Sequence, residues 1–490
     1  MDETDRLERL TTSLTELRPC PPRHRQSQLR ALHTSLVSAE SSLSAAIASD
    51  SPRNTPAEVE AEYLQSVETV RHFYDGINVA AEAEQEYAIV KGKDAGKRRV
   101  GVGMVVVRPG GWGHTRLFGI IAAVAAAVAG GNCVILELPP SDRAVDKVLS
   151  EILTGAMDIN TFWVSPAEIT SPEILARAVL VDQAGPGPAT TLTNQIFSSS
   201  QARVVAVVDR TADIEAAARA VTTARFAFGG GSPYAPDLVL VHEFVKQKFL
   251  EACSRFVIGA SAERKRDVAG EEEKNTRQAI QEAADRGEAV NFGSDDCKLV
   301  DVLDRNSPIT TLKITGCFLP IASCSSLVDA VSFQPPETTL LAGYFFANPP
   351  SAKYLSQFLP AHTSFTNHIP PSRLLGPAAA LAHDFPGLSL SSSPSLFPCP
   401  YTTESFTRAR PQFVVPPPPT TKPKERRRKA ALGPLRPTGQ PKTLEGLDHF
   451  AGALFLGGGL VLAVVVPLVG WTSYVAGKAA VGYFSSRLRR

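Results

Sequence analysis

The stretch FAFGGGSPYAPDLVLVHE, from Phe226 to Glu243, decides the fold of this chain. Its run Leu238–Val241 is short, apolar and rich in β-branched residues, which predicts a buried strand. The Gly229–Gly231 run and two prolines precede the strand and predict a turn. Helical patterns lie on either side, at residues 214–226 and 244–256. The stretch therefore predicts a strand placed between two helices.

The same alternation continues outward in both directions. Residues 100–107, 133–136 and 204–208 are further β-rich runs. The segment Leu117–Ala129 between the first two is alanine-rich and apolar on all sides, which is typical of a buried helix. Alternating strands and helices favour an α/β fold with a doubly wound parallel sheet. Ahead of this region we expect helices at 5–17, 25–48 and 58–74, and residues 263–285 predict an exposed charged helix with a loop.

Composition excludes several classes of function. The chain has 490 residues, with 50 Lys and Arg against 49 Asp and Glu, so no net field favours a nucleic-acid partner. Its seven cysteines are irregularly spaced, which predicts free thiols in a reducing compartment rather than a disulfide framework. The start, MDETDRLERL, has no apolar core typical of a signal peptide. No histidine has metal-ligand spacing, so no metal site is expected.

The C-terminal part differs in composition. Residues 413–448 are rich in proline and contain the basic run KPKERRRK, which predicts a linker without a core. Residues 450–471 are about 22 apolar residues, enough to span roughly 30 Å of hydrocarbon as a helix. More basic residues precede this segment than follow it, so we expect a single-pass anchor with the globular part in the cytosol. An anchor so near the C-terminus suits the endoplasmic reticulum, and a buried core helix is the alternative.

Several motifs resemble those of one known family. They are ordered along residues 25–411 and include VGVGMVVVRPGGWGHTRLF (100–118), AAAVAGGNCVILELPPSD (125–142), VVAVVDRTADIEAAARAV (204–221), SPYAPDLVLV (232–241) and SPITTLKITGCFLPI (307–321). Together these motifs resemble the aldehyde dehydrogenase superfamily. With the membrane-anchored tail, they point to the branch that contains fatty and apocarotenoid aldehyde dehydrogenases.

The resemblance implies a Rossmann-like cofactor domain, an α/β catalytic-type domain and dimers formed through a β flap. The expected organisation is as follows: residues 1–209, N-terminal helices and the Rossmann-like cofactor-type domain; 210–385, the catalytic-type domain; 386–412, a return segment to the oligomerisation flap; 413–448, the linker; and 449–490, the transmembrane anchor and basic tail.

The residues that carry the family's chemistry are replaced here. The family uses a thiolate nucleophile, an amide that binds the oxyanion and a glutamate that activates water. By the resemblance these positions are Pro233, Gly113 and Ser199. Ser232 is a possible replacement nucleophile, but an unassisted hydroxyl stays protonated and the sequence shows no histidine near it. Cys253 and Cys317 are expected in a helix and a strand away from this loop, as buried thiols.

The positions that would hold NAD or NADP are also changed. The family's ribose-binding lysine aligns near Glu137, and its ribose-binding glutamate aligns with Lys313, so both charges are reversed. Trp112 aligns with the tryptophan of the family's Pro-Trp-Asn turn. The helix start that cradles the pyrophosphate is replaced by a stretch containing Gly185-Pro186-Gly187, which is typical of a surface turn because the proline has no N–H to offer.

Two functions remain open. The first is a catalytically degenerate membrane-anchored homologue that binds a partner, such as an active paralogue, or a lipid-like aldehyde. It would be a homodimer or a heterodimer. The second is NAD(P)-dependent oxidation of long-chain or isoprenoid aldehydes to carboxylic acids through residues that the motifs do not identify.

Overall fold

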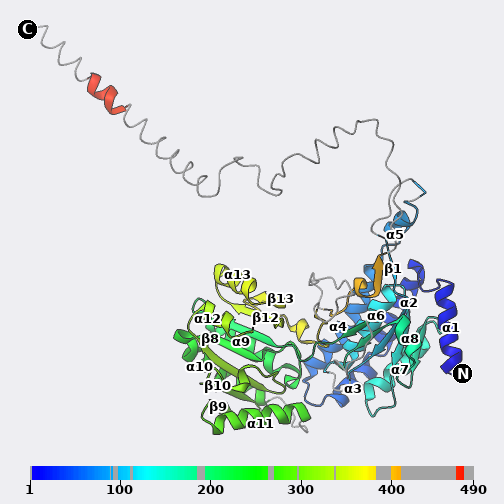
Figure 1. The fold of residues 1–490 in the computed structure, drawn as a ribbon, viewed down its shortest axis with the longest axis horizontal. Helices are drawn as coiled ribbons and strands as arrows, with labels where there is room; N and C mark the ends of the chain where they lie inside the picture. Colours follow the sequence, from blue (N-terminus) through cyan, green and yellow to red (C-terminus); the bar gives the residue numbers. More distant parts are fainter. Residues whose placement is uncertain are drawn as a thin grey trace, which may run out of the picture. The chain divides into compact units, whose positions relative to one another are not determined.

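The structure is a computed structural model that describes residues 3–88, 90–91, 98–110, 114–184, 194–262, 270–294, 297–335, 338–381, 399–409 and 471–478. The chain divides into two units, Met1–Val415 and Pro416–Arg490. Figure 1 shows the helices and strands of the first unit. In the second unit, residues 471–478 are helical. The predicted anchor, 450–471, lies outside the described residues except for Trp471. Within the described ranges, no helix combines the length and apolar character needed to span a membrane.

The first unit begins with a layer of helices. They are α1 (Glu3–Thr15), α2 (Pro22–Ser38), α3 (Glu40–Asp50), α4 (Pro56–Asp75) and α5 (Val79–Glu86). The helix predicted at 25–48 is two helices, because Ala39 leaves helical geometry at φ −102° and ψ 15°. A capping box starts α4, in which Thr55 Oγ1 accepts from Glu58 N and Glu58 Oε2 accepts from Thr55 N.

The helices α6 and α7 pack on one face of a five-stranded parallel sheet, and α2 and α4 pack against these helices. The strands of this sheet, in spatial order, are β4 (Phe162–Ser165), β3 (Cys133–Glu137), β2 (Met104–Arg108), β5 (Ala178–Asp182) and β6 (Gln195–Phe197), with helices α6 (Arg116–Ala129), α7 (Ala144–Ala156) and α8 (Pro172–Arg177). Alternate residues face opposite sides, so Val105 and Val107 meet these helices whereas Met104 and Val106 meet α1 and α8. The predicted buried helix is confirmed, since every residue of α6 after Arg116 is buried.

The strand predicted at 100–107 is divided. Gly103, at φ +114°, separates β2 from β1 (Arg99–Gly101). β1 pairs antiparallel with β14 (Thr407–Ala409), so the chain returns to this point after more than 300 residues.

A seven-stranded sheet forms the rest of the unit. Its order is β13 (Ala361–Thr366), β12 (Leu340–Phe346), β7 (Val204–Val208), β8 (Leu238–His242), β11 (Phe318–Cys324), β10 (Lys298–Val302) and β9 (Ala289–Gly293), and only the β9–β10 pair is antiparallel. Helices α9 (Ile214–Phe226) and α10 (Glu243–Ala262) cover one face; α11 (Glu271–Asp285), α12 (Leu327–Ser332) and α13 (Pro349–Phe358) cover the other.

The strand β7 lies in this second sheet, paired with β8 and β12. The expected organisation groups these residues with 1–209, so its boundary at 209 falls after a strand that pairs with β8 and β12, because strand pairing rather than chain order decides to which sheet a strand belongs. The predicted α/β fold with parallel sheets and strand–helix alternation is confirmed.

Candidate functional site

The loop from Phe226 to Asp237, which we call the 226–237 loop, joins α9 to β8. Three consecutive residues are left-handed: Phe228 at φ 53°, Gly229 at 65° and Gly230 at 74°. Only glycine fits at position 230, since a Cβ there would overlap the backbone of Gly316. The glycine run therefore serves a tight turn against a neighbouring segment, as the sequence predicts.

Ser232 and Pro233 present no nucleophile. The Ser232 side chain is 2% exposed, and its Oγ accepts a hydrogen bond from Tyr234 N at 3.2 Å. Pro233 Cδ lies 3.5 Å from where a Cβ on Gly376 would stand, so its ring packs against that residue. Ser232 therefore completes a turn of the loop.

Most backbone N–H groups of the loop are also used within the fold. Phe228 N donates to Glu58 Oε1 at 2.7 Å, and Gly231 N donates to Phe228 O at 3.2 Å. Ala235 N donates to Ser232 O, and Asp237 N donates to Val204 O. An oxyanion hole needs donors aimed at the reacting centre. Here these donors are committed to neighbouring protein oxygens.

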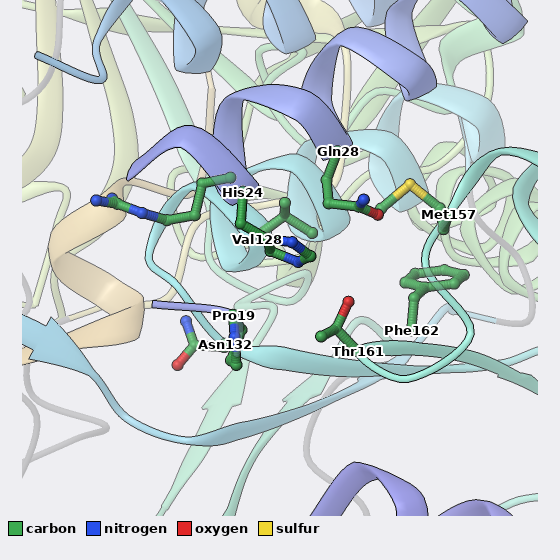
Figure 2. Close-up of a pocket in the computed structure, with 9 residues that line it drawn as sticks. Pro19, His24, Gln28, Val128, Asn132, Met157, Thr161 and Phe162 are labelled. Carbon is green, nitrogen blue, oxygen red and sulfur yellow. The ribbon is translucent and has the colours of Figure 1, made fainter. Parts of the chain in front are cut away.

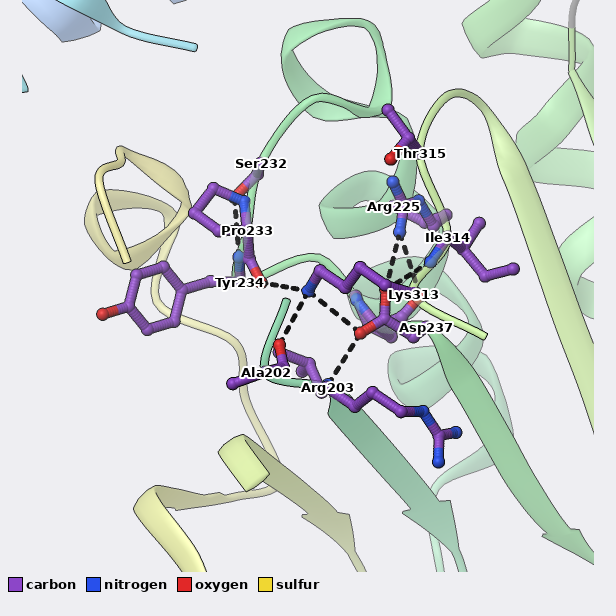
Figure 3. A network of polar contacts seen from close by, with 12 residues as sticks. Ala202, Arg203, Arg225, Ser232, Pro233, Tyr234, Asp237, Lys313, Ile314 and Thr315 are labelled. Atoms are coloured by element: carbon purple, nitrogen blue, oxygen red, sulfur yellow. Dashed lines mark hydrogen bonds and ion pairs between the residues drawn. The ribbon is translucent and has the colours of Figure 1, made fainter. Parts of the chain in front are cut away.

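Lys313 fills the space behind the loop (Figure 3). Its Nζ donates to Pro233 O at 2.7 Å, to Asp237 Oδ2 at 3.0 Å and to Ala202 O at 3.1 Å. An ammonium has three protons, so this group is fully bonded. Lys313 joins the 226–237 loop to the segments that enter β7 and β11. The resemblance aligns Lys313 with the family's ribose-binding glutamate, with reversed charge, and in the structure its Nζ donates to groups of the protein itself.

Asp237 is the centre of this network and is fully buried. Its Oδ1 accepts from Ile314 N at 3.1 Å, and its Oδ2 accepts from Val204 N at 2.7 Å. The Arg225 guanidinium, also fully buried, lies 3.6 Å from Oδ1 and donates to Pro236 O and Gly230 O. Burial lowers the pKa of the Lys313 ammonium, and the ion pair with Asp237 opposes that shift. One carboxylate thus balances two buried cations.

Ser199, at the position of the family's glutamate, also has a structural contact. Its Oγ accepts from Leu381 N at 3.2 Å. Nearby, Ala379 N donates to Tyr234 OH at 3.0 Å, and Gly376 N donates to Thr115 Oγ1 at 2.9 Å. The segment 374–381 is therefore bound to the 226–237 loop, to Ser199 and to the start of α6.

Sequence reasoning missed His114, because it lies 118 positions before Ser232 in the chain. No histidine is near Ser232 in the sequence, but the fold brings His114 to the 226–237 loop: a Cβ on Gly231 would be 3.6 Å from His114 Cβ, and the imidazole packs edge-on against Phe228 with centroids 4.7 Å apart. His114 Nε2 donates to Leu374 O at 2.6 Å, and burial lowers its pKa to about 4. The ring is neutral and holds the 374–381 segment in place.

The cysteines are buried thiols, with Cys20 partly so. Cys253 is in α10, and burial raises its pKa to about 12. Cys317 is buried as expected, but its predicted distance from the loop is wrong, because Gly316 N donates to Gly230 O at 3.1 Å and brings Cys317 beside it. The described residues contain no group of His, Cys, Asp or Glu that could hold a metal.

The cofactor positions carry internal ion pairs. Glu137, fully buried at the end of β3, accepts from Arg108 Nε at 2.6 Å, Arg108 Nη2 at 3.2 Å and Ile169 N at 2.8 Å. Its two oxygens are thus occupied. Trp112, Gly113 and Gly185–Gly187 lie outside the described residues. At Glu137 and Lys313, the residues present do not fit a nicotinamide cofactor, since neither side chain is free to bind a ribose.

Carboxylates also occupy two helix N-termini beside the first sheet. Glu62 Oε1 accepts from Leu117 N at 2.9 Å and Phe118 N at 3.4 Å at the start of α6. Asp50 accepts from Ala144 N and Val145 N at the start of α7. Helix N-termini attract anions. Here carboxyl groups of α3 and α4 accept these hydrogen bonds from within the chain.

Two hollows lined by described residues lie away from the 226–237 loop. One is a surface groove of about 490 Å³ along α1. The other has a volume of about 10 Å³ and lies beneath α2 (Figure 2).

Comparison with known proteins supports the family resemblance. The chain is 24% identical over 363 residues to the dimeric NADP-preferring aldehyde dehydrogenase of Rattus norvegicus, across 66% of this chain and 76% of the relative. It is 25% identical over 267 residues to 4,4'-diaponeurosporen-aldehyde dehydrogenase of Staphylococcus aureus, across 46% and 54%.

Solved structures agree with the sequence comparison. The substrate-bound AldH of Staphylococcus aureus superposes with a TM-score of 0.61 at 18% identity, covering 84% of this chain and 94% of that one. No protein-family model matches the chain. By sequence and by fold, this chain is similar to members of the aldehyde dehydrogenase superfamily.

Proposed function

We propose that this protein is a degenerate member of the superfamily, which does not oxidise aldehydes through a thioester and acts by binding. The proposed partner is a second subunit, either a copy of this chain or an active paralogue, with a lipid-like aldehyde as the alternative ligand. The proposal rests on the three hydrogen bonds of Lys313 to Pro233, Asp237 and Ala202. They commit the 226–237 loop to a structural network.

Three further features support the proposal. Oxidation through a thioester needs a nucleophile, a water-activating base and a hydride acceptor. Pro233 and Ser199 offer neither a thiolate nor a carboxylate, and Ser232 is buried in a turn. The carboxylate of Glu137 is already paired with the Arg108 guanidinium, so it is not available to a cofactor. Because the losses affect all three requirements, no single substitution accounts for them.

A second candidate function is oxidation of long-chain or isoprenoid aldehydes with NAD or NADP. The observation in its favour is the similarity to enzymes named as aldehyde dehydrogenases, one of them acting on 4,4'-diaponeurosporen-aldehyde. This candidate requires a nucleophile other than Pro233 and Ser232.

Assays of the unmodified protein and of its Pro233→Cys variant separate the two functions. With a long-chain aldehyde and NAD or NADP, we expect neither protein to produce reduced nicotinamide, since the base is still absent. Rates should stay on the order of 10⁴-fold or more below an active family member. Adding Ser199→Glu tests whether the base limits the reaction. Turnover by the unmodified protein at a family-like rate would establish the second function instead.

We also propose that residues 450–471 anchor the protein in the endoplasmic reticulum membrane with the globular unit in the cytosol. Deleting residues 447–490 should move the protein from the membrane pellet to the soluble fraction after cell fractionation. A full-length chain with a glycosylation acceptor after Arg490 should be modified, because its end would reach the lumen. A truncated, non-aggregated protein that still pellets with membranes would contradict the anchor.

A further inference from the structure

We propose that Arg53 and Glu58, which we call the clasp, hold Phe228 and Gly229 of the 226–237 loop in place, and that the clasp opens without unfolding of the seven-stranded sheet. Arg53 is in the connection between α3 and α4, and Glu58 is in the first turn of α4. The clasp therefore belongs to the helices packed beside the first sheet, whereas the loop leads into the second. The proposal concerns access to the loop and does not depend on the proposed function.

Arg53 lies across the loop. Its stem packs on Gly229, since a Cβ built there would stand 3.1 Å from Arg53 Cδ and 3.3 Å from Arg53 Cβ. Its guanidinium pairs with Glu273 of α11, with 2.6 Å between Nη1 and Oε2. The two side chains are 26% and 10% exposed, so salt screens this pair less than a surface pair. Arg53 thus reaches from the α3–α4 connection to α11 by way of the loop.

Glu273 covers the segment on which the loop rests. A Cβ on Gly316 would be 2.8 Å from Glu273 Cγ, and a Cβ on Gly230 would be 2.2 Å from Gly316 C. Gly316 N also donates to Gly230 O at 3.1 Å. The ion pair of Arg53 and Glu273 therefore spans the contact between the loop and the segment that enters β11.

Glu58 holds the backbone of the loop at the neighbouring residue. Its Oε1 accepts from Phe228 N at 2.7 Å, and its Oε2 accepts from Thr55 N at 2.8 Å in the capping box of α4. Phe228 is left-handed, at φ 53°, a conformation that residues other than glycine rarely adopt. Glu58 thus joins an unfavourable backbone conformation to the start of a helix.

Other contacts hold the rest of the loop. Lys313 donates to the carbonyl of its second half, and Arg225 donates to Gly230 O. Of the three left-handed residues, Phe228 and Gly229 are the two that the clasp contacts. A non-glycine residue in this conformation persists only where its surroundings hold it. Loss of the clasp therefore frees Phe228 and Gly229, while Lys313 and Arg225 keep the loop joined to the sheet.

Hydrogen exchange of the full-length protein, measured by mass spectrometry, tests the clasp. The variant Arg53→Met/Glu58→Gln removes both charges that contact the loop and leaves side chains of similar length. The amides of Phe228 and Gly231, of which the second donates to Phe228 O, should exchange about ten-fold faster or more. Peptides from β7 and β8 should exchange as they do in the unmodified protein. Each single substitution should have a smaller effect than the pair.

The matched control is Arg255→Met/Glu215→Gln, which makes the same change of charge at an exposed ion pair between α10 and α9. It should leave the exchange of Phe228 and Gly231 unchanged. Two results overturn the proposal. One is unchanged exchange of these amides in the clasp variant. The other is equal acceleration in the loop and in β7 and β8, because the loop would then open only with the whole sheet.

Discussion

Replacing Lys313 with methionine should lower the free energy of unfolding by about 3 kcal/mol, the lower end of the range for breaking a buried ion pair. The substitution leaves the carbonyls of Pro233 and Ala202 without their donor and removes one of the two cations beside Asp237. Arg225, 3.6 Å from Asp237, limits the loss. Chemical denaturation monitored by intrinsic fluorescence measures the change.

The control for this experiment is Lys353→Met, which removes an exposed lysine from α13 and should change stability by less than about 0.5 kcal/mol. Lys313→Glu restores the type of residue that the family resemblance places there. It should destabilise more than methionine, since a second carboxylate would stand beside the buried Asp237. If Lys313→Met is as stable as the unmodified protein, the structural role of the network is wrong, and so is the main support for a degenerate site.

The second large effect concerns Glu62, whose pKa is raised by burial to about 7 from a usual value of 4.5. The hydrogen bonds from Phe118 and Leu117 oppose this shift, and Asp50 adds to it. The folded protein therefore holds a proton that the unfolded chain releases between pH 4.5 and 7. The contribution of this proton binding to the free energy of unfolding is fully present below pH 4.5 and is lost as pH rises through 7.

Glu62→Gln should remove this pH dependence. The amide stays neutral, and its oxygen still accepts from Leu117 N. Near pH 5 the variant should match the unmodified protein, and at pH 9 it should be about 3 kcal/mol more stable, from a shift of roughly 2.5 pKa units. Denaturation at several pH values measures the difference. Glu60→Gln, an exposed change on the same helix, is the control. A difference between Glu62→Gln and the unmodified protein that does not vary with pH would rule out the protonation of Glu62.

Lys313 and Glu62 have one feature in common. In both, a polar side chain reaches a backbone group far along the chain: Lys313 reaches Pro233, and Glu62 reaches Leu117. We infer that the 226–237 loop and the start of α6 are held by the fold without a ligand. This agrees with a protein that acts through its surface.

Much of the fold could be read from local sequence. The runs Leu238–Val241 and Val204–Val208 are too apolar for anything but a buried strand, and Leu117–Ala129 too apolar for an exposed helix. Local pattern failed at Ala39, where a helix divides, and at Gly103, where a strand divides. Each break depends on the backbone geometry of one residue. The spacing of apolar residues along the sequence does not predict that geometry.

The sequence by itself determined which chemical groups the candidate site lacks. Proline at 233 has no thiol and no N–H, and serine at 199 has no carboxylate, whatever the structure around them. Only the tertiary structure decided what the remaining residues do. The fold places His114 against the 226–237 loop and Lys313 against Asp237. It also pairs the Glu137 carboxylate with the Arg108 guanidinium. These contacts join residues 29 to more than 110 positions apart. The partner of a buried charge is set by how the strands and loops pack, which spacing along the chain does not reveal.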